Sequence, residues 1–258
     1  MKKSTWNNLR ALQLKAKKIK SYDYVMHFMA VNKQVLLGGK SLPSMKALGF
    51  KCLFSDAGIF YCKVKGNLII AVVHVDDAMF FGKDLKLVNQ KKQLFMDKWE
   101  CRDLGEAKEF LCMHIQRKGQ DVYLDQTVYL QKVIQRFGME NAKAAPTPLP
   151  TGWNPKENTG KADPKLIKDY QTIIRSLLYI VIGTCPDISY AVMKLATFAA
   201  NPSHEHWEKV KYILRYLLGS KDYRLVYRGK SSKGLIAYTD SDWAADLSAD
   251  QSLATSLS

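Results

Sequence analysis

The residues best suited to chemistry are two adjacent carboxylates, Asp76 and Asp77, which follow His74 and Val75 at the end of an apolar run. Neighbouring carboxylates at the end of a buried strand are costly unless a cation neutralises them. Mg²⁺ is the usual cation because it prefers oxygen ligands, and phosphoryl-transfer enzymes use two such ions on the attacking and leaving oxygens. Asp-Asp is also an ordinary solvated turn. Taken alone, these letters favour the turn and leave the metal site as an alternative.

The elements around the two carboxylates are predicted from apolar periodicity and turn residues. Residues 58–65 and 68–75 are predicted strands, joined by a turn at Gly66 and Asn67. The return at 78–81 makes a second hairpin with both carboxylates at its tip. Downstream, the patterns predict a helix, two short strands and a second helix that stops at Gly138, over residues 85–99, 110–117, 121–125 and 126–137.

The second half of the chain is predicted to be mainly helical. Residues 144–164 contain five of the eight prolines, so this stretch is the clearest linker. Apolar helical spacing then covers residues 168–182, 187–200 and 203–218, with His204 and His206 as solvated residues near a helix start. A final strand pair at 223–227 and 234–239 leads to Asp240.

Charge is the most unusual feature of the composition. The chain has 39 Lys and Arg against 24 Asp and Glu, a net charge of +15. Residues 1–20 alone hold seven basic residues and no acid. A surplus of this size attracts polyanions, of which nucleic acid is the commonest, although many basic proteins bind none specifically.

Cysteine usage and hydropathy bound the cellular context. The five cysteines are scattered and form no C-x-x-C pair, which argues against a disulfide framework or a zinc site and favours a reducing compartment. No apolar run approaches the roughly 18 residues that a membrane-spanning helix needs. The N-terminus lacks the apolar region of a secretory signal. We therefore expect a cytoplasmic or nuclear protein that is not secreted and does not bind a membrane.

Several long motifs occur together in one order. They read ALGFKCLFSDAGIFYCKVKGNLIIAVVHVDDAMFFG, DLGEAKEFLCMHIQ, VYLDQTVYLQKVIQRFGMENAKAAPTPLP, YQTIIRSLLYIVIGTCPDISYAVMKLATFAANPSHEHWEKVKYILRYLLGS and GLIAYTDSDWAAD. Over roughly residues 46–246, this series resembles the reverse transcriptase of copia-type LTR retrotransposons and the opening strand of that family's RNase H. The resemblance implies a truncated copy of that polyprotein region.

The resemblance implies an α+β fold. It would comprise a partial reverse-transcriptase palm with a catalytic β-hairpin, a helical thumb and connection, and an incomplete RNase H-like end. The implied divisions are a basic segment without a family match, the C-terminal half of the palm with the thumb, a Pro-rich linker with the helical connection, and the start of RNase H, over residues 1–45, 46–150, 151–222 and 223–258.

The resemblance also assigns roles to individual residues. Asp76 and Asp77 would be the catalytic, Mg²⁺-binding aspartates of the palm, with Asp76 the more direct ligand, and Asp240 the first metal-binding carboxylate of RNase H. His74 would face the primer end, or simply pack within its strand. The hairpin at residues 104–115 would hold the primer strand through Leu104, Gly105, Phe110 and Leu111. The implied partners are an RNA template, a DNA primer and a complete copy of the polyprotein.

The chain also departs from the family pattern. The upstream D-V-x-x-A-F-L motif, which supplies a third palm carboxylate, is absent, and Asp23 matches it poorly. RNase H activity requires further acidic residues downstream of Asp240, but after Asp246 the chain reads LSADQSLATSLS where the family usually has R-K-S-T-S-G. Cys112, Arg175 and Cys185 replace a glycine, a glycine and an arginine of the family motifs. These departures predict that the two-metal chemistry is lost.

Three hypotheses for function therefore stand beside one another. The first is an active RNA-directed DNA polymerase whose missing groups come from residues 1–45 or from a partner chain. The second is a catalytically inactive remnant of a retrotransposon polyprotein. The third is a non-catalytic module that binds nucleic acid through its basic surface and exposed aromatic residues, with binding that weakens as salt rises.

Overall fold

The computed structural model describes residues 25–31, 45–75, 77–99 and 101–229. These residues form two antiparallel sheets and a set of packed helices, which confirms the expected α+β class. Within the described ranges, no helix combines the length and the apolar content that crossing a membrane requires.

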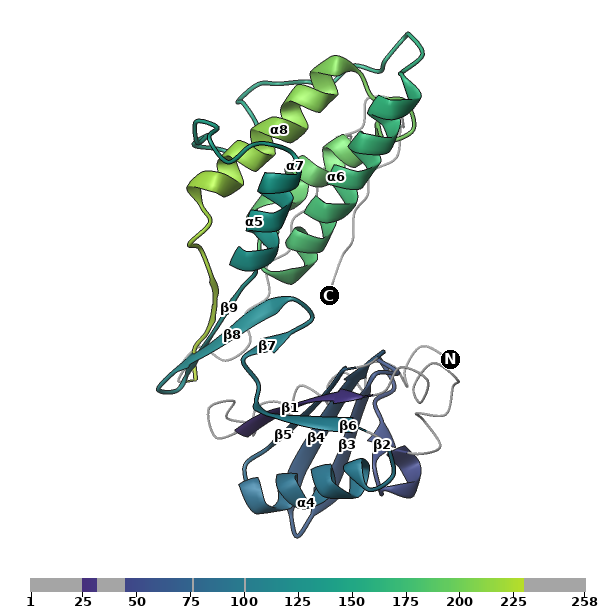
Figure 1. The fold of residues 1–258 in the computed structure, drawn as a ribbon, viewed down its shortest axis with the longest axis vertical. Helices are drawn as coiled ribbons and strands as arrows, with labels where there is room; N and C mark the ends of the chain where they lie inside the picture. Colours follow the sequence, from purple (N-terminus) through teal and green to yellow (C-terminus); the bar gives the residue numbers. More distant parts are fainter. Residues whose placement is uncertain (1–24, 32–44, 76, 100, 230–258) are drawn as a thin grey trace, which may run out of the picture. The chain divides into compact units, whose positions relative to one another are not determined.

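The first sheet has six strands in the order β2-β3-β4-β5-β1-β6 (Figure 1). Its strands are β1 (Val25–Val31), β2 (Lys51–Cys52), β3 (Ile59–Val64), β4 (Asn67–His74), β5 (Asp77–Gly82) and β6 (Cys101–Glu106). The β3–β4 and β4–β5 hairpins agree with the prediction, although the first turn lies at Lys65 and Gly66, one residue earlier than expected.

Helix α4 (Leu85–Met96) covers one face of this sheet (Figure 1). Asp84 starts the helix because its side chain accepts from the backbone N–H groups of Lys86 and Leu87. The helix ends three residues before the predicted limit of 99. Its Phe95 packs edge-on against Phe80 of β5, inside a cluster of buried apolar residues.

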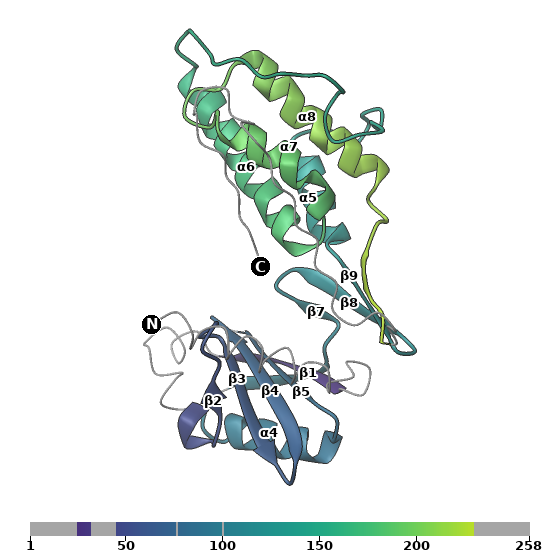
Figure 2. The ribbon, with the colours of Figure 1, turned by 180° about the vertical axis from the view of Figure 1, so that it is seen from behind.

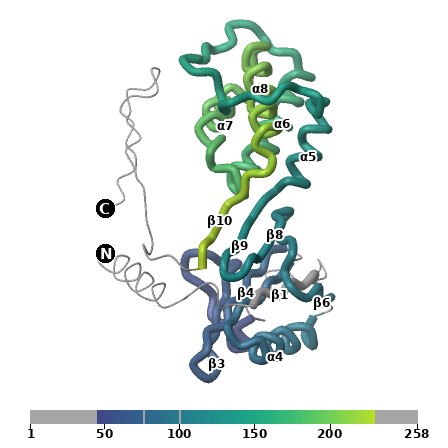
Figure 3. Tube along the Cα trace, turned by 90° about the vertical axis from the view of Figure 1, so that its left-hand side faces the viewer, coloured from purple at the N-terminus to yellow at the C-terminus, as the bar shows by residue number. Residues whose placement is uncertain are grey.

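The second sheet has the strand order β10-β9-β8-β7. Its strands are β7 (Glu109–Phe110), β8 (Met113–Lys118), β9 (Asp121–Asp125) and β10 (Leu225–Tyr227). The single strand predicted at 110–117 is therefore divided by a turn at Leu111 and Cys112. Figure 3 shows β10 beside β9, although about a hundred residues separate them in the sequence. Residues 234–239, the expected partner of β10, lie outside the described ranges.

The helices that follow β9 share one apolar core. They are α5 (Thr127–Arg136), α6 (Pro164–Gly183), the 3₁₀ turn η2 (Pro186–Ile188), α7 (Ser189–Ala196) and α8 (His204–Gly219). Figure 2 shows α6 and α7 side by side, as Figure 1 does from the other side. Leu130 and Ile134 of α5 belong to the same buried cluster as Tyr170 of α6 and Leu214 of α8. The boundary expected between residues 150 and 151 therefore runs through a single core.

Residues 144–163 pack against the helices, which corrects their prediction as a linker. The side chain of Asn201 holds this segment. Its Oδ1 accepts from the N–H of Ala162, and its Nδ2 donates to the carbonyls of Asn158 and Gly160 at 3.1 and 2.9 Å. The indole N–H of Trp153 donates to Glu205 at the start of α8. The Pro-rich segment is thus ordered although it is neither helix nor strand, because a side chain supplies hydrogen-bond partners for its backbone N–H and C=O groups.

Candidate functional site

The β4–β5 hairpin carries the residues predicted to do chemistry. His74 lies opposite Asp77 in the ladder, so only Val75 and Asp76 connect the two strands. Asp77 is half-buried as the first residue of β5, which corrects the expectation that both carboxylates lie at the tip. Asp76 and Asp240 lie outside the described residues.

Val75 has a backbone angle that a β-branched side chain rarely adopts. Its φ is +52°, in the left-handed region. Such a conformation persists only where its surroundings enforce it, and it is concentrated at functional turns. Here the enforcing element is the tight two-residue connection between β4 and β5, which are the central strands of an apolar sheet.

Strand β1 is the neighbour of β5 on its other side. Ala30 lies directly opposite Asp77 in this antiparallel pair, as His74 does across β4. Directly opposite residues share a face of the sheet, with Cβ atoms about 5 Å apart. The sequence of β1, VMHFMAV, contains no acid. The position that lies beside Asp77 on β1 therefore offers no carboxylate.

The segment predicted to hold a primer contains a bulge and a tight turn. Phe28 of β1 pairs with Gly105 and Met29 with Asp103, which leaves Leu104 unpaired and largely exposed. The N–H of Gly105 donates to the Asp103 carboxylate, which also accepts from Lys92 of α4 at 2.6 Å. This ion pair fixes the bulge against the helix.

Phe110 and Leu111 have different surroundings. Phe110 is 8% exposed and packs with Met79, Ala107 and Ile115, so its side chain anchors the hairpin in a buried apolar cluster. Leu111 lies in the β7–β8 turn with a φ of +50°. Of the predicted primer contacts, Leu104 is thus exposed and Gly105 and Leu111 are half-buried, whereas the Phe110 ring is part of the core.

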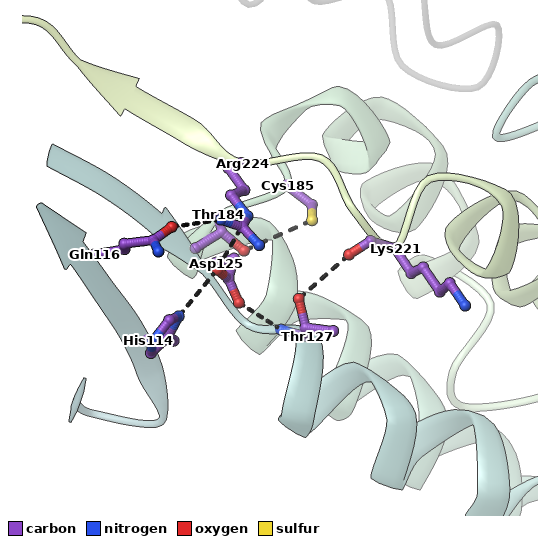
Figure 4. Close-up of polar contacts among 8 residues, drawn as sticks. All are labelled: His114, Gln116, Asp125, Thr127, Thr184, Cys185, Lys221 and Arg224. Carbon is purple, nitrogen blue, oxygen red and sulfur yellow. Dashed lines mark hydrogen bonds and ion pairs between the residues drawn. The ribbon is translucent and has the colours of Figure 1, made fainter. Parts of the chain in front are cut away.

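A second polar cluster was not predicted from the sequence (Figure 4). The buried carboxylate of Asp125, at the end of β9, lies 3.2 Å from Nδ1 of His114 and 3.4 Å from Nε of Arg224. It also accepts from the N–H of Thr127. The guanidinium of Arg224 further donates to Gln116 at 2.7 Å. The cluster joins the β8–β9 hairpin to the chain entering β10, which is about a hundred residues further along the sequence.

The charge of Asp125 is stabilised where it lies. Burial opposes ionisation, but the hydrogen bonds from Thr127 and His114 outweigh it and hold the pKa of this carboxyl below its ordinary value. The only sequence signal was an Asp directly before a helix. Its partner Arg224 is about a hundred residues downstream, so no local pattern could have indicated the pair.

The carboxylates that the structure describes around this hairpin are too few for a complete two-metal centre. Among the residues that the structure describes, no three His, Cys, Asp or Glu side chains are grouped to hold an ion. Residues 75–77 (Val-Asp-Asp) form the VDD turn. Asp77 is its one described carboxylate, and the neighbouring strand β1 has none. Mg²⁺ binds with near-octahedral geometry through several oxygen ligands, so one or two neighbouring carboxylates hold it weakly.

The sequence is similar to that of a known protein family. The sequence model of the family described as reverse transcriptase (RNA-dependent DNA polymerase) matches residues 41–151. The Pol polyprotein from transposon TNT 1-94 of Nicotiana tabacum is 35% identical over 217 residues, which cover 79% of this chain and 16% of the polyprotein. The Pol polyprotein from transposon RE2 of Arabidopsis thaliana is 31% identical over 77% of the chain and 14% of its own length.

An uncharacterized mitochondrial protein of Arabidopsis thaliana is also similar, with 31% identity over 67% of this chain and 71% of its own length. No solved structure matches the chain with comparable significance. The chain belongs to the reverse transcriptase region of copia-type retrotransposon Pol polyproteins. It spans about a sixth of the length of the polyproteins that it matches.

Proposed function

We propose that this chain is the palm and thumb portion of a retrotransposon reverse transcriptase, which binds a primer–template duplex but does not extend it alone. The β4–β5 hairpin carries the proposal. Its two-residue turn, with Val75 held at a φ of +52° between central strands of the sheet, supports a role for Asp76 and Asp77 as the palm's catalytic pair.

The lack of polymerisation is inferred from the strand beside this hairpin. Two-metal phosphoryl transfer depends on carboxylates that fix both ions, and β1 supplies none opposite Asp77. Asp76 and Asp77 would then bind Mg²⁺ weakly. By the same family resemblance, residues 223–258 would belong to RNase H, with Asp240 as a metal ligand.

Binding of nucleic acid is supported by charge. The excess of 15 positive charges favours a polyanion, and the proposed thumb includes residues 126–140. The proposal assigns the RNA template and DNA primer as ligands of this chain. Association with a complete polyprotein copy is the route by which missing carboxylates could be supplied.

The first experiment measures binding and extension on the same labelled RNA–DNA primer–template. We expect binding that weakens steeply with salt and no extension with Mg²⁺ and deoxynucleotides. Affinity that is negligible at every salt concentration would refute the binding. Extension that is lost in the Asp76→Asn/Asp77→Asn variant would refute the claim of inactivity and identify an active polymerase.

A second experiment adds the carboxylate that β1 lacks. Ala30→Asp would place an acid opposite Asp77, so Mn²⁺ affinity measured by electron paramagnetic resonance should rise relative to the unchanged chain. Ala30→Asn is the matched control, since it has the same size without the charge. Equal affinities in the two variants would contradict the inferred geometry.

A further inference from the structure

The turn between β7 and β8 is strained. Phe110 pairs with Met113, so Leu111 and Cys112 form a two-residue connection, with φ angles of +50° and +55°. Turns with two such residues normally contain glycine or asparagine, because a side chain crowds the backbone there. A turn without either residue needs support from outside the hairpin.

Tyr179 of α6 supplies that support. Its hydroxyl donates a hydrogen bond of 2.5 Å to the backbone carbonyl of Leu111, which lies 68 residues away in sequence. Its ring packs edge-on against Tyr129 of α5, with centroids 5.0 Å apart. The donor is therefore fixed by two helices of the core and does not depend on the hairpin.

The hydroxyl of Tyr179 can donate this hydrogen bond at neutral pH. Burial, followed by the neighbouring Cys112, raises the pKa of Tyr179, so the phenol keeps its proton at neutral pH. The base of the hairpin is anchored separately, because Phe110 and Ile115 are buried with Met79. The base is thus set by apolar packing, whereas at the tip the Tyr179 hydroxyl binds the Leu111 carbonyl.

The geometry points to Tyr179 as a positioning residue that holds the Leu111 turn in the form that meets the primer strand. This inference rests on the function proposed above, in which residues 104–115 hold the primer. Tyr179 acts through the Leu111 carbonyl and makes no contact of its own with the reacting atoms.

The test uses the full chain and four variants: Tyr179→Phe, Cys112→Gly, the double variant, and Tyr190→Phe. Tyr190 is the matched control because it is 73% exposed on α7. Amide hydrogen exchange follows residues 111–113, and fluorescence anisotropy follows binding of an RNA–DNA primer–template. Loss of one neutral hydrogen bond should speed exchange and weaken binding by about five-fold in Tyr179→Phe.

Rescue distinguishes positioning from general support of the core. Glycine adopts a positive φ without strain, so Cys112→Gly in the Tyr179→Phe background should restore both slow exchange and duplex affinity. Tyr190→Phe should change neither. A double variant that stays impaired would show that Tyr179 acts by stabilising the helices, which overturns the inference.

The remaining outcomes separate the two proposals. Unchanged exchange in Tyr179→Phe would refute the hold on the turn. Faster exchange with unaltered duplex affinity would refute the role in binding the primer strand. If the unchanged chain binds no duplex, the proposed function fails together with that role, and exchange alone then decides whether Tyr179 sets the turn.

Discussion

The imidazole of His206 stacks on the ring of Phe198, with centroids 4.0 Å apart and planes 19° apart. His206 is fully buried at the start of α8, where its Nδ1 accepts from the N–H of Ser203 and its own N–H donates to the Ser203 hydroxyl. This reciprocal capping box starts the helix. The expectation of a solvated histidine holds for His204, which is exposed, and is wrong for His206.

Acid should destabilise the chain through His206. Burial lowers the pKa of this imidazole below its ordinary value of 6.5. The unfolded chain therefore binds the proton more readily, so the free energy of unfolding should fall as the pH drops below about 6.5 and stop falling below the folded-state pKa. Urea midpoints measured between about pH 8 and about pH 5 follow this change.

The matched variants for this prediction are His206→Gln and His204→Gln. Glutamine preserves the capping function at the third helical position but does not titrate. The decline should vanish in His206→Gln and persist in His204→Gln. A decline that survives in His206→Gln would assign the acid sensitivity to another group.

Removing Arg224 should leave the Asp125 carboxylate short of donors. Arg224→Met is expected to lower the free energy of unfolding by about 2 kcal/mol, since it leaves a buried carboxylate without its ion-pair partner. Urea unfolding at neutral pH measures the loss. Glu208→Gln is the control, because its pair with Lys211 is exposed and should contribute less than about 1 kcal/mol. Equal effects would contradict a special role for the buried cluster.

Cys112→Gly should stabilise the chain. Cys112 has a φ of +55°, and removing its side chain relieves about 1–2 kcal/mol of strain against a smaller entropic cost, for a net gain of about 1 kcal/mol. Thermal unfolding measures the gain. Cys112→Ala removes the thiol without relieving the strain, so it should give no such gain.

The β8–β9 turn provides the reverse control for this prediction. Gly119 has a φ of +61° with open space around its Cα. Gly119→Ala should therefore cost about 1 kcal/mol through backbone strain alone. A stabilising Gly119→Ala would show that these turns relax freely, which would undermine the argument for Cys112.

Asn201→Ala should release the Pro-rich segment. Four hydrogen bonds tie the Asn201 side chain to residues 158–162, and nothing replaces them in the variant. Limited trypsin digestion should then cut faster at Lys156 and Lys161, which lie on this segment. Asn154→Ala is the control because Asn154 is exposed. Unaltered cleavage in Asn201→Ala would mean that Trp153 and its neighbours hold the segment without it.

Local patterns predicted most single elements and few of their partners. The apolar face of α5, with Leu130, Val133 and Ile134, is buried as its spacing indicated. The division of the strand at 110–117 was missed, because Leu111 and Cys112 show no turn signal. The order of the strands also escaped prediction, since the pairs β1–β5 and β9–β10 depend on distant contacts and not on periodicity.

The candidate site was predictable only in part. The residues of the VDD turn were identified from their resemblance, whereas their register, with Asp77 in the ladder, required coordinates. The Asp125 and Arg224 pair had no sequence signature. Asn201 similarly gave no indication that it would hold a segment 40 residues upstream.

The position of β1 in the sheet affects both how this chain folds and how far it can be shortened. β1 precedes every other described strand, yet it lies between β5 and β6. The complete sheet therefore forms only after β1 has paired with strands that are distant in sequence. A shortened chain that begins at residue 41, where the family match starts, would lose this strand. Both β5 and β6 would then have unpaired edges, so such a fragment should aggregate even though every residue of the VDD hairpin is present.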